Sequence, residues 1–388
     1  MRRVLRTIAI CLLSLLVVPP AIAAAKTRRR GRSLRSLWAV HPVPTVPLKA
    51  QAERSLGVEV ETLAFETNRL VDRFDHVLSR GRNRLWRGVA AFAAFVWAVR
   101  RFDRLHFFFD RGLLPGFRPR RFNPIELWVY RALGKQTFFW AYGADVRMRK
   151  STLALPAPNC CLQCPHPGRY CVCDDRDAER CQRRIGRTAT ATFSLGDMKR
   201  YTPGSINDLF YWPIDLSDAS FEPAYPDASA QAPLVVVHAP NHRFFKGTDH
   251  LLGAIEQLRA RGVAVELDLI EGLPRDQALR RYRRADVVFD QCLIGFHGYF
   301  ALEAMGMGKP VLCFLRDPQR DVLAPDECPI LNIRPQTIAA AIERLAGDRA
   351  LVHRLGRQGR AYVERYYTVE AFAQRLAETY TRLGVCTL

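Results

Sequence analysis

The sequence lacks an apolar run of the length that a membrane-spanning helix needs. Its two candidates, Ile8–Val18 and the aromatic and alanine-rich Trp86–Arg101, are both shorter than the roughly 20 residues that cross a bilayer. Arginines flank the second candidate, and we expect it to be a core helix, with contact to a membrane surface left open. The sequence therefore argues against an integral membrane protein.

Acidic residues are few relative to basic ones. The 388 residues include 38 Asp and Glu against 58 Lys and Arg, which gives a formal net charge of +20. Arginine-rich chains suit phosphate groups, nucleic acids or anionic membranes. No RNA-binding motif is present and the basic residues are dispersed, so we expect nucleotides and anionic lipids as partners and no nucleic acid. A genome that favours arginine codons would explain much of the excess equally well.

Apolar content is sufficient for two domains. Short apolar segments alternate with amphipathic ones, which is typical of βαβ units with helices on both faces of a parallel sheet. We predict an α/β protein with a first domain at 33–221, whose last strand falls within Ser205–Phe221. A Pro-, Ala-, Ser- and Asp-rich linker at 222–232 leads to a second domain at 233–366. A C-terminal helix at 367–388 is expected to cross back to the first domain.

Residues 1–32 form a separate leader. Three arginines in Met1–Arg6 precede the apolar Ile8–Val18, and Ala21–Ala25 offers a small-residue cleavage site. This is the layout of a secretory signal. A weak membrane anchor and an upstream start that adds an unstructured leader are the alternatives. From the residues alone, export ranks first.

The most informative pattern covers residues 285–315. An apolar segment, Asp286–Leu293, is followed by glycines, by the helical segment Tyr299–Met307 and by the apolar Pro310–Phe314. This order predicts a strand, a turn, a short helix and a second strand. Glu303 lies on that helix, near the carboxyl end of a strand, where open α/β sheets bind ligands.

A phosphate site is predicted upstream of this pattern. The apolar strand Leu234–Ala239 leads into a polar loop that contains Lys246 and Gly247, and Thr248 is expected to cap the next helix. Backbone amides, the helix dipole and a lysine together suit a phosphate group, with Arg243 nearby. A solvated basic loop is the alternative when Lys246 is taken alone.

The motifs HAPNHRFFKGTDHLLGAIEQL and ADVVFDQCLIGFHGYFALEAMGMGKPV resemble the C-terminal domain of bacterial GT-B glycosyltransferases, family 4-like. The resemblance is strong over Pro233–Gly384 and weaker over Leu37–Leu216. It implies two doubly wound, Rossmann-like domains that face a cleft. It also implies transfer of a sugar from a nucleotide-sugar donor to a carbohydrate or lipid-linked acceptor, with retention and without a catalytic metal. Cell-surface polysaccharide synthesis is the expected setting.

The resemblance also implies roles for individual residues. Lys246, with Arg243, would stabilise charge on the donor diphosphate, and Glu303 would hold ribose or sugar hydroxyl groups. The family commonly has a further glutamate, separated by seven residues, at the position where this chain has Gly295. The other expected donor-site residues are Asn241, Gly247, His297 and Gly298.

A second group of residues is predicted on the acceptor side. The predicted strand Thr137–Tyr142 runs into the sequence GADVR, and the resemblance places Asp145 and Arg147 beside the acceptor or its phosphate. His41, in the loop after the first strand, faces the same region on topology. An internal ion pair that stiffens the loop is an equal alternative for Asp145 and Arg147.

Cysteines concentrate in an insert at 159–182, which holds six of the eleven. Two close pairs, Cys161 with Cys164 and Cys171 with Cys173, are joined by a six-residue loop and predict a compact four-thiolate site. We expect a structural zinc there. An iron–sulfur cluster is the second choice and disulfides the third, the latter becoming the main alternative if the protein is exported.

Two other functions remain open from the sequence. One is a sugar-nucleotide epimerase-like enzyme on the same fold, and the other is a non-catalytic metal- or redox-responsive binding protein. A nucleotide-sugar enzyme needs a cytoplasmic donor. We therefore expect the protein in the cytoplasm or at the cytoplasmic face of the inner membrane, where it would contact anionic lipid peripherally, unless the leader is a genuine export signal.

Overall fold

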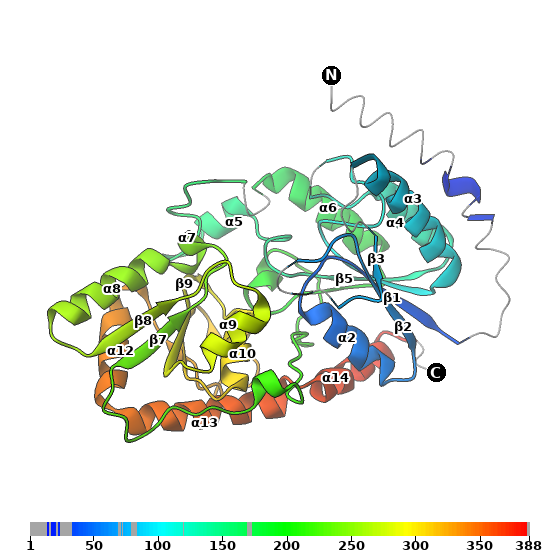
Figure 1. Ribbon diagram of the computed structural model, residues 1–388. Helices are drawn as coiled ribbons and strands as arrows, with labels where there is room; N and C mark the ends of the chain where they lie inside the picture. Colours follow the sequence, from blue (N-terminus) through cyan, green and yellow to red (C-terminus); the bar gives the residue numbers. More distant parts are fainter. Residues whose placement is uncertain are drawn as a thin grey trace. The chain divides into compact units, whose positions relative to one another are not determined.

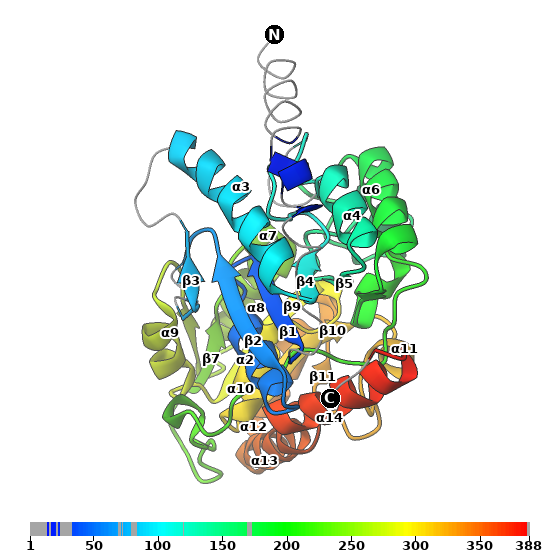
Figure 2. The same cartoon turned by 90° about the vertical axis from the view of Figure 1, so that its right-hand side faces the viewer.

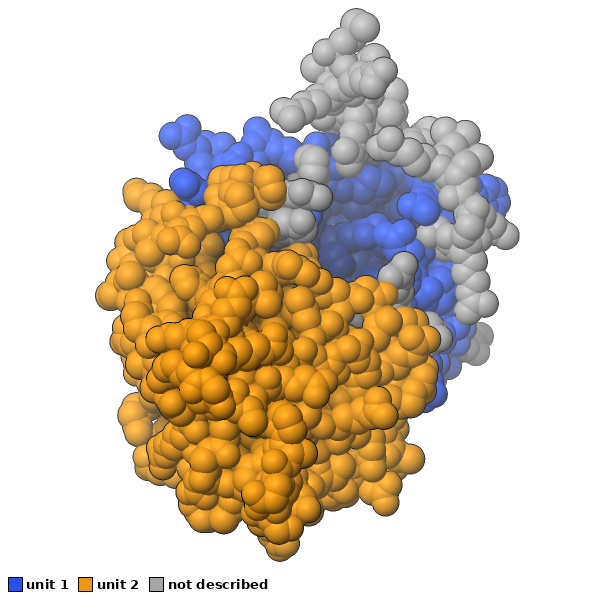
Figure 3. Space-filling model, turned by 60° about the vertical axis from the view of Figure 1, so that its left-hand side comes forward, with its two compact units in different colours: residues 1–149, 168–209, 373–388 blue, residues 150–167, 210–372 orange. Residues whose placement is uncertain are grey.

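The computed structural model describes residues 33–385 except 69–70, 72, 79–83, 119 and 169–172, together with residues 14, 17–20 and 22–23 (Figure 1). The chain divides into two compact units (Figure 3). Unit 1 consists of residues 1–149, 168–209 and 373–388, and unit 2 of residues 150–167 and 210–372. No helix in the described part of the chain is long and apolar enough to span a membrane.

Unit 1 is built on a parallel sheet with six strands among the described residues, in the order β3-β2-β1-β4-β5-β6 (Figure 2). The strands are β1 (Arg35–Val40), β2 (Glu59–Ala64), β3 (His76–Val77), β4 (Arg104–Phe108), β5 (Gln136–Trp140) and β6 (Ala191–Phe193). The helices are α2 (Thr45–Arg54), α3 (Arg84–Arg101), α4 (Pro124–Ala132), α6 (Asp175–Thr188) and most of α14 (Val369–Arg382). A 3₁₀ helix covers Gly196–Arg200.

Alternating side chains of β4 show which helices cover each face of this sheet. Arg104 donates to Glu53 of α2 at 2.8 Å, and Tyr380 of α14 donates to the same carboxylate at 3.0 Å. Phe107, three residues further along β4, points to the opposite face of the sheet and stacks on Tyr130 of α4. Because successive side chains of a strand alternate in direction, α2 and α14 lie on one face and α4 on the other.

One predicted strand does not form. The prediction of a strand within Ser205–Phe221 is wrong, because the described residues there make only isolated bridges at Ile206 and Ile214 and a 3₁₀ helix at Ala219–Phe221. Pro213 interrupts the segment and has no N–H group to donate to a strand ladder. β6 takes the edge position of the sheet instead.

Unit 2 contains a five-stranded parallel sheet among the described residues, in the order β11-β10-β9-β7-β8. The strands are β7 (Leu234–His238), β8 (Val265–Leu269), β9 (Val287–Gly295), β10 (Val311–Leu315) and β11 (Leu331–Asn332). The helices are α7 (Arg243–Lys246), α8 (Thr248–Ala260), α9 (Arg275–Tyr282), α10 (Tyr299–Gly306), α11 (Pro318–Asp321), α12 (Ile338–Gly347) and α13 (Arg349–Tyr366). α5 (Arg149–Leu153) begins at the boundary between the units, and two further 3₁₀ helices cover Ala219–Phe221 and Pro335–Thr337.

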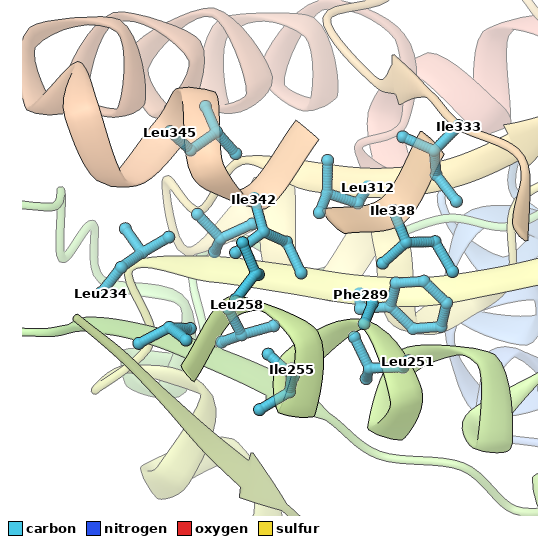
Figure 4. Packing of buried hydrophobic residues seen from close by; sticks show 14 of the residues in the cluster. Leu234, Leu251, Ile255, Leu258, Phe289, Leu312, Ile333, Ile338, Ile342 and Leu345 are labelled. Atoms are coloured by element: carbon cyan, nitrogen blue, oxygen red, sulfur yellow. The ribbon is translucent and has the colours of Figure 1, made fainter. Parts of the chain in front are cut away.

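A single apolar cluster fixes the helices on one face of the unit 2 sheet (Figure 4). Leu251, Ile255 and Leu258 recur at helical spacing on α8 and are almost fully buried. They pack with Phe289 of β9 and with α12, whose apolar residues Ile338, Ile342 and Leu345 follow the same period. Burial of these side chains stabilises the packing of α8 and α12 on the sheet, by about 25 cal/mol for each Å² of apolar surface removed from water.

Candidate functional site

The candidate site of unit 2 lies where the order of its strands reverses. β7 is bonded to β8 on one side and to β9 on the other, and the chain leaves β7 and β9 in opposite directions across the sheet. In open α/β sheets, ligands bind outside the carboxyl ends of the strands at such a switch point. Lys246 follows β7 and Glu303 follows β9, so the topology brings both segments to this edge.

Lys246 lies against a buried carboxylate at the switch point. Its Nζ donates to Oδ1 of Asp290 at 2.6 Å, and the Gly298 amide donates to Oδ2 at 2.5 Å. Asp290 is fully buried, whereas 12% of the Lys246 side chain is exposed. Burial alone would raise the pKa of Asp290, but the Lys246 ammonium and the two hydrogen bonds hold it below its usual value. Asp290 therefore fixes a cation beside the glycine turn, and an ammonium group has three N–H donors to share.

Gly298 keeps the space around this ion pair open. A Cβ atom at Gly298 would lie 3.0 Å from Asp290 Oδ1 and 3.0 Å from Lys246 Nζ. Contacts that close would push the carboxylate and the ammonium apart. The absence of a side chain thus allows the backbone of the turn to approach the ion pair, as close approach to a phosphate would also require.

The start of α8 differs from the prediction. Gly247, with φ of +74°, is the N-cap and Thr248 is the first helical residue, so the prediction that Thr248 caps the helix is wrong. The Thr248 hydroxyl is bonded instead to Nε2 of buried His238, at 2.8 Å. A Cβ atom at Gly247 would collide with Cys292 Sγ, and a positive φ is strained for other residues. Glycine is therefore required at this position.

The remaining predicted residues of this loop are exposed. Arg243 is about half exposed and forms an ion pair with Glu271. Asn241 is exposed in the turn before α7. Exposed pairs of this kind are worth little and exchange partners readily, so Arg243 is free to reach an incoming anion. Lys246, by contrast, is held by Asp290.

His297 is buried behind the glycine turn and neutral. Burial lowers the pKa of His297 to about 4. Its ring packs against Phe296, Trp212 and Tyr367. Nε2 is buried and has no hydrogen-bond partner within the described ranges. An unsatisfied buried nitrogen is uncommon in folded proteins.

Glu303 is held by an arginine that the sequence did not single out. Arg275, the first residue of α9, donates from Nη2 to Oε1 of Glu303 at 2.8 Å. Burial raises the pKa of Glu303, and the ion pair with Arg275 acts in the opposite direction. Glu303 is 8% exposed, and Arg275 Nε is buried without a hydrogen-bond partner in the part of the chain described. The pair is therefore oriented and still has unused hydrogen-bonding capacity.

Gly295 occupies the position where the resemblance has a further glutamate, and the structure shows what fills that space. Gly295 has φ of +98°, and a Cβ atom there would lie 3.0 Å from Cβ and 3.1 Å from Nε of Arg316. The Arg316 guanidinium donates to the carbonyl oxygens of Pro156, at 2.6 Å, and of Pro158. A glutamate would be strained and crowded here. The Arg316 guanidinium, which is hydrogen-bonded to the 156–158 segment, therefore occupies the space in which the resemblance would place a glutamate side chain.

The segment that Arg316 holds also covers a cavity at this edge of unit 2. The cavity has a volume of about 350 Å³. Its lining includes Asn159 and Cys160 from the segment, Gly247 and His250 from the start of α8, and Pro335 after β11. The first half of the cysteine-rich insert thus belongs to the surroundings of the switch point in unit 2.

The cysteines do not assemble a metal site among the described residues. Cys161 and Cys164 belong to unit 2, whereas Cys173 belongs to unit 1. Cys171 lies outside the described residues. No group of three or more His, Cys, Asp or Glu side chains in the described ranges is arranged to hold a metal ion. Zinc and iron–sulfur therefore find no support in the cysteines that are described, and a site that includes Cys171 stays a prediction.

Unit 1 has its own switch point, between β1 and β4. His41 follows β1 and Asp110 follows β4. His41 Nε2 lies 2.8 Å from Oδ1 of Asp110, and the Tyr142 hydroxyl donates to Oδ2 at 2.9 Å. Burial would raise the pKa of Asp110, but His41 and Tyr142 hold it below its usual value. Asp110 thus orients the imidazole, whose side chain is 18% exposed.

Asp145 lies beside this group and is bound by backbone amides. The amides of Tyr142 and Gly143 each donate to its Oδ1 at 2.9 Å. Burial, and then the Asp110 charge, raise the pKa of Asp145 to about 8. Burial lowers the pKa of nearby Lys49 to about 7, although Asp145 acts against that shift. Proton occupancy at this edge is therefore sensitive to pH near neutrality.

Arg147 takes part in a separate ion pair. Its Nη2 donates to Oδ2 of Asp197 at 2.7 Å, and both side chains are 9% exposed. Asp197 lies on the 3₁₀ helix that follows β6. Arg147 therefore anchors that helix to the loop after β5, and the structure gives it a bracing role next to Asp145.

Sequence reasoning missed four residues of these two sites: Asp290, Arg275, Asp110 and Tyr142. Asp290 had a signal, because it interrupts an otherwise apolar predicted strand. Asp110 had one too, since it directly follows the run FFF at the end of a predicted strand. Buried carboxylates are rare unless paired, so both deserved a search for partners. Arg275 stands among many arginines and had no distinguishing signal.

Comparisons with known proteins give likeness at the level of structure alone. No family model matches the sequence, and no curated protein matches it. Sucrose-phosphate synthase from Thermosynechococcus elongatus is similar at 17% identity and a TM-score of 0.61, over 91% of this chain and 99% of that one. HepE of Anabaena, solved with UDP-glucose, is similar at 11% identity and a TM-score of 0.56, over 90% and 100%.

A third solved structure agrees with these two. WaaG, a glycosyltransferase involved in lipopolysaccharide biosynthesis, is similar at 13% identity and a TM-score of 0.54, over 90% of this chain and 100% of that one. Each likeness runs through both parallel-sheet units. Together with the two switch points, these likenesses confirm the predicted fold: the chain has the two Rossmann-like units of GT-B glycosyltransferases.

Proposed function

We propose that the protein is a glycosyltransferase that moves a sugar from a nucleotide-sugar donor to a hydroxyl group of a carbohydrate or lipid-linked acceptor. One observation carries the proposal: Asp290 holds the Lys246 ammonium against the Gly298 turn, at the switch point of the unit 2 sheet. A fixed cation and a close backbone approach suit the diphosphate of such a donor. The GT-B fold supports the same reading.

In this proposal Lys246 binds the donor diphosphate and stabilises it as it departs. As the bond between the anomeric carbon and the phosphate oxygen breaks, negative charge grows on the diphosphate. The ammonium already stands at the site, so its electrostatic effect needs no reorganisation. Arg243 adds a second cation when it exchanges Glu271 for the donor.

Glu303 and Arg275 then orient the sugar or the ribose. The carboxylate oxygens accept hydrogen bonds from donor hydroxyl groups, and Arg275 holds the carboxylate in place. The buried Nε2 of His297 and the buried Nε of Arg275 are further hydrogen-bonding groups that a donor would satisfy. The proposed role of these residues is positioning of the anomeric carbon.

We infer retention from the resemblance, with the acceptor on the side of unit 1. The acceptor hydroxyl then loses its proton to an oxygen of the departing phosphate, while its oxygen bonds to the anomeric carbon. His41, with Asp110 behind it, would accept a hydrogen bond from a hydroxyl group of the acceptor. Asp145 and Arg147 would shape the loop beside it. The anomeric configuration of the product tests retention.

The proposed setting is cell-surface polysaccharide synthesis, in the cytoplasm or at the cytoplasmic face of the inner membrane. WaaG, which shares the fold, acts in lipopolysaccharide biosynthesis, and this supports a carbohydrate or lipid-linked acceptor. Fractionation of cells, with N-terminal sequencing of the mature protein, tests the location. Cleavage near Ala25 together with an extracytoplasmic fraction would favour export instead.

Titration calorimetry with UDP and GDP tests the donor site. We expect at least one of the two to bind, and we expect free sugars to bind far more weakly. Conversion of a donor to a second sugar nucleotide without any acceptor would favour the epimerase-like alternative. Binding of neither nucleotide, together with no release of diphosphate from any donor, would contradict the proposal.

The metal hypothesis is tested separately. A structural zinc that includes Cys171 predicts about one zinc per chain by elemental analysis of the purified protein. Iron with visible absorbance would favour an iron–sulfur cluster. Mass spectrometry that shows disulfides and no metal would favour the third choice.

A further inference from the structure

Unit 1 has a second cavity, lined with arginines, that the proposed transfer reaction does not use. It lies between α6 and the loop that leads into α4, two helices that pack side by side (Figure 2). The volume is about 190 Å³, below the range of roughly 300–1,000 Å³ typical of pockets for whole drug-sized ligands. The cavity therefore suits one chemical group of a larger ligand. Its lining residues are Phe117, Arg118, Arg121, Phe122, Pro124, Leu127, Asp177, Arg180, Cys181 and Arg184.

The charge of the lining is strongly unbalanced. Four arginines face one carboxylate, Asp177, which pairs with Arg118. Arg180 and Arg184 lie one turn apart on α6 and have no ion-pair partner in the described ranges. Cations held close together without an anion repel one another. The cavity is thus complementary to an anion.

Arg121 adds a more specific signal. Its Nη1 and Nη2 donate to the carbonyl oxygens of Arg120, at 2.9 Å, and of Asp174, at 3.0 Å, so the guanidinium is fixed in place. Its Nε is buried and has no hydrogen-bond partner among the residues described. A fixed guanidinium with a spare donor, next to the two exposed arginines of α6, matches the several oxygens of a phosphate group.

We propose that this cavity binds a phosphate group carried by a larger molecule. The opposite wall is apolar, with Phe117, Phe122 and Leu127, so the carrier presents an apolar or ring face next to its phosphate. A soluble phosphate ester and a lipid phosphate headgroup both have this chemistry. The site is made by unit 1 alone and does not depend on the donor chemistry proposed for unit 2.

Binding of phosphate ligands to the full chain tests the proposal. The soluble probe is phenyl phosphate, which carries a ring next to its phosphate, and the lipid probe is a vesicle of phosphatidylcholine with phosphatidylglycerol, compared with phosphatidylcholine alone. The test variant is Arg180→Ala with Arg184→Ala. The matched control is Arg176→Ala with Arg187→Ala, which removes the same charge from exposed positions of α6 that do not line the cavity. Measurements at about 0.15 M salt suppress general attraction.

We expect the test variant to lose at least tenfold in affinity for one of the two probes, and the control to change less than threefold. Loss for phenyl phosphate identifies a soluble ester, whereas loss for vesicles alone identifies a lipid. Equal losses in both variants, or no binding of either probe by the unmodified chain, would overturn the proposal.

Cys181 provides a second readout that does not depend on transfer activity. Its thiol lies in the wall of the cavity, with Sγ 3.7 Å from the carbonyl oxygen of Phe109. We expect the bound probe to slow alkylation of Cys181, as followed by peptide mass spectrometry, and to leave Cys328 of unit 2 unchanged. Unaltered alkylation of Cys181 at a saturating probe concentration would contradict binding in this cavity.

Discussion

Asp290 at the switch point of unit 2 and Asp145 beside the switch point of unit 1 are buried aspartates with opposite pKa shifts. In unit 2, Asp290 is neutralised by the Lys246 ammonium, and its pKa lies below the usual value. In unit 1, Asp145 is bound by backbone amides, and its pKa is raised to about 8. The unit 2 edge thus presents an ammonium that its carboxylate partner holds in place, with further N–H donors for an anionic diphosphate. The unit 1 edge combines Asp145 with the His41–Asp110 pair, and these hydrogen-bonding groups suit hydroxyl groups.

Under the proposed function, this difference would let one fold, repeated twice, bind two different substrates. Both sheets are parallel and both reverse strand order, so topology places a ligand edge on each. The two edges differ in what binds a buried aspartate. In unit 2 the Lys246 ammonium binds Asp290, and in unit 1 backbone amides bind Asp145. The choice of ligand depends on a few side chains at the strand ends, whereas the parallel sheet that carries them has the same architecture in both units.

The largest expected effect concerns the cation of unit 2. Lys246→Ala should weaken nucleoside diphosphate binding by about 1.5–3 kcal/mol. It should also destabilise the protein by about 3–5 kcal/mol, because Asp290 is left buried and unpaired. The double variant Lys246→Ala with Asp290→Asn separates the two effects. We expect it to recover most of the stability in urea unfolding and none of the affinity in calorimetry. Recovery of affinity would show that Lys246 acts only as a structural partner.

The next effect concerns the opposite pKa shifts of the two aspartates. Because folding raises the pKa of Asp145, its contribution to stability is greatest below the unfolded value near 4 and is lost as the pH rises toward about 8, by about 1.4 kcal/mol per pH unit. Folding lowers the pKa of Asp290, so its contribution is present at neutral pH and is lost as the pH falls through that lowered value.

Urea unfolding between pH 2 and pH 9 measures both slopes. We expect Asp145→Asn to remove the loss of stability toward alkaline pH, and Asp290→Asn to remove the loss toward acid pH. The same slope in both variants would mean that the two carboxylates do not differ as described.

A smaller effect is expected at Glu303. Glu303→Gln should leave the fold intact and lower the transfer rate by roughly 30- to 160-fold, since a charged hydrogen bond to the donor is worth about 2–3 kcal/mol. Glu271→Gln is the control, because Glu271 is an exposed partner of Arg243. Circular dichroism and a donor-consumption assay provide the two measurements. Unfolding of Glu303→Gln would assign the residue to structure, through its pair with Arg275.

The smallest effect is expected on the unit 1 side. Asp110→Asn removes the charge that orients His41 and should raise the KM for the acceptor several-fold, at unchanged affinity for the nucleotide. Tyr142→Phe removes only the second hydrogen bond to Asp110 and should have a weaker effect of the same kind. Steady-state kinetics with varied acceptor measures both. An equal effect on nucleotide affinity would place the Asp110 group outside the acceptor site.

Much of the fold could be predicted because apolar periodicity dominates it. The strand near residue 290, the short helix with Glu303 and the helix after Lys246 all follow apolar patterns that the structure reproduces within a few residues. The failures have local causes. Thr248 looked like a cap, but a glycine with positive φ precedes it and takes that position.

Less of the site could be predicted, because its important contacts join residues far apart in the chain. The Lys246–Asp290 pair spans 44 residues, and the His41–Asp110 pair spans 69. No local pattern links such partners. The position of Arg316 beside Gly295 could not be predicted for the same reason, since Arg316 is held by a hydrogen bond to the distant 156–158 segment.

Release of nucleoside diphosphate from a panel of nucleotide sugars, with and without carbohydrate acceptors, tests the central claim most directly. The unmodified chain should release diphosphate from at least one donor, faster when an acceptor is present. The Lys246→Ala, Asp290→Asn double variant should be folded and at least tenfold slower. Release that is equally fast in the double variant, or absent for every donor in the unmodified chain, would contradict a donor site built on Lys246.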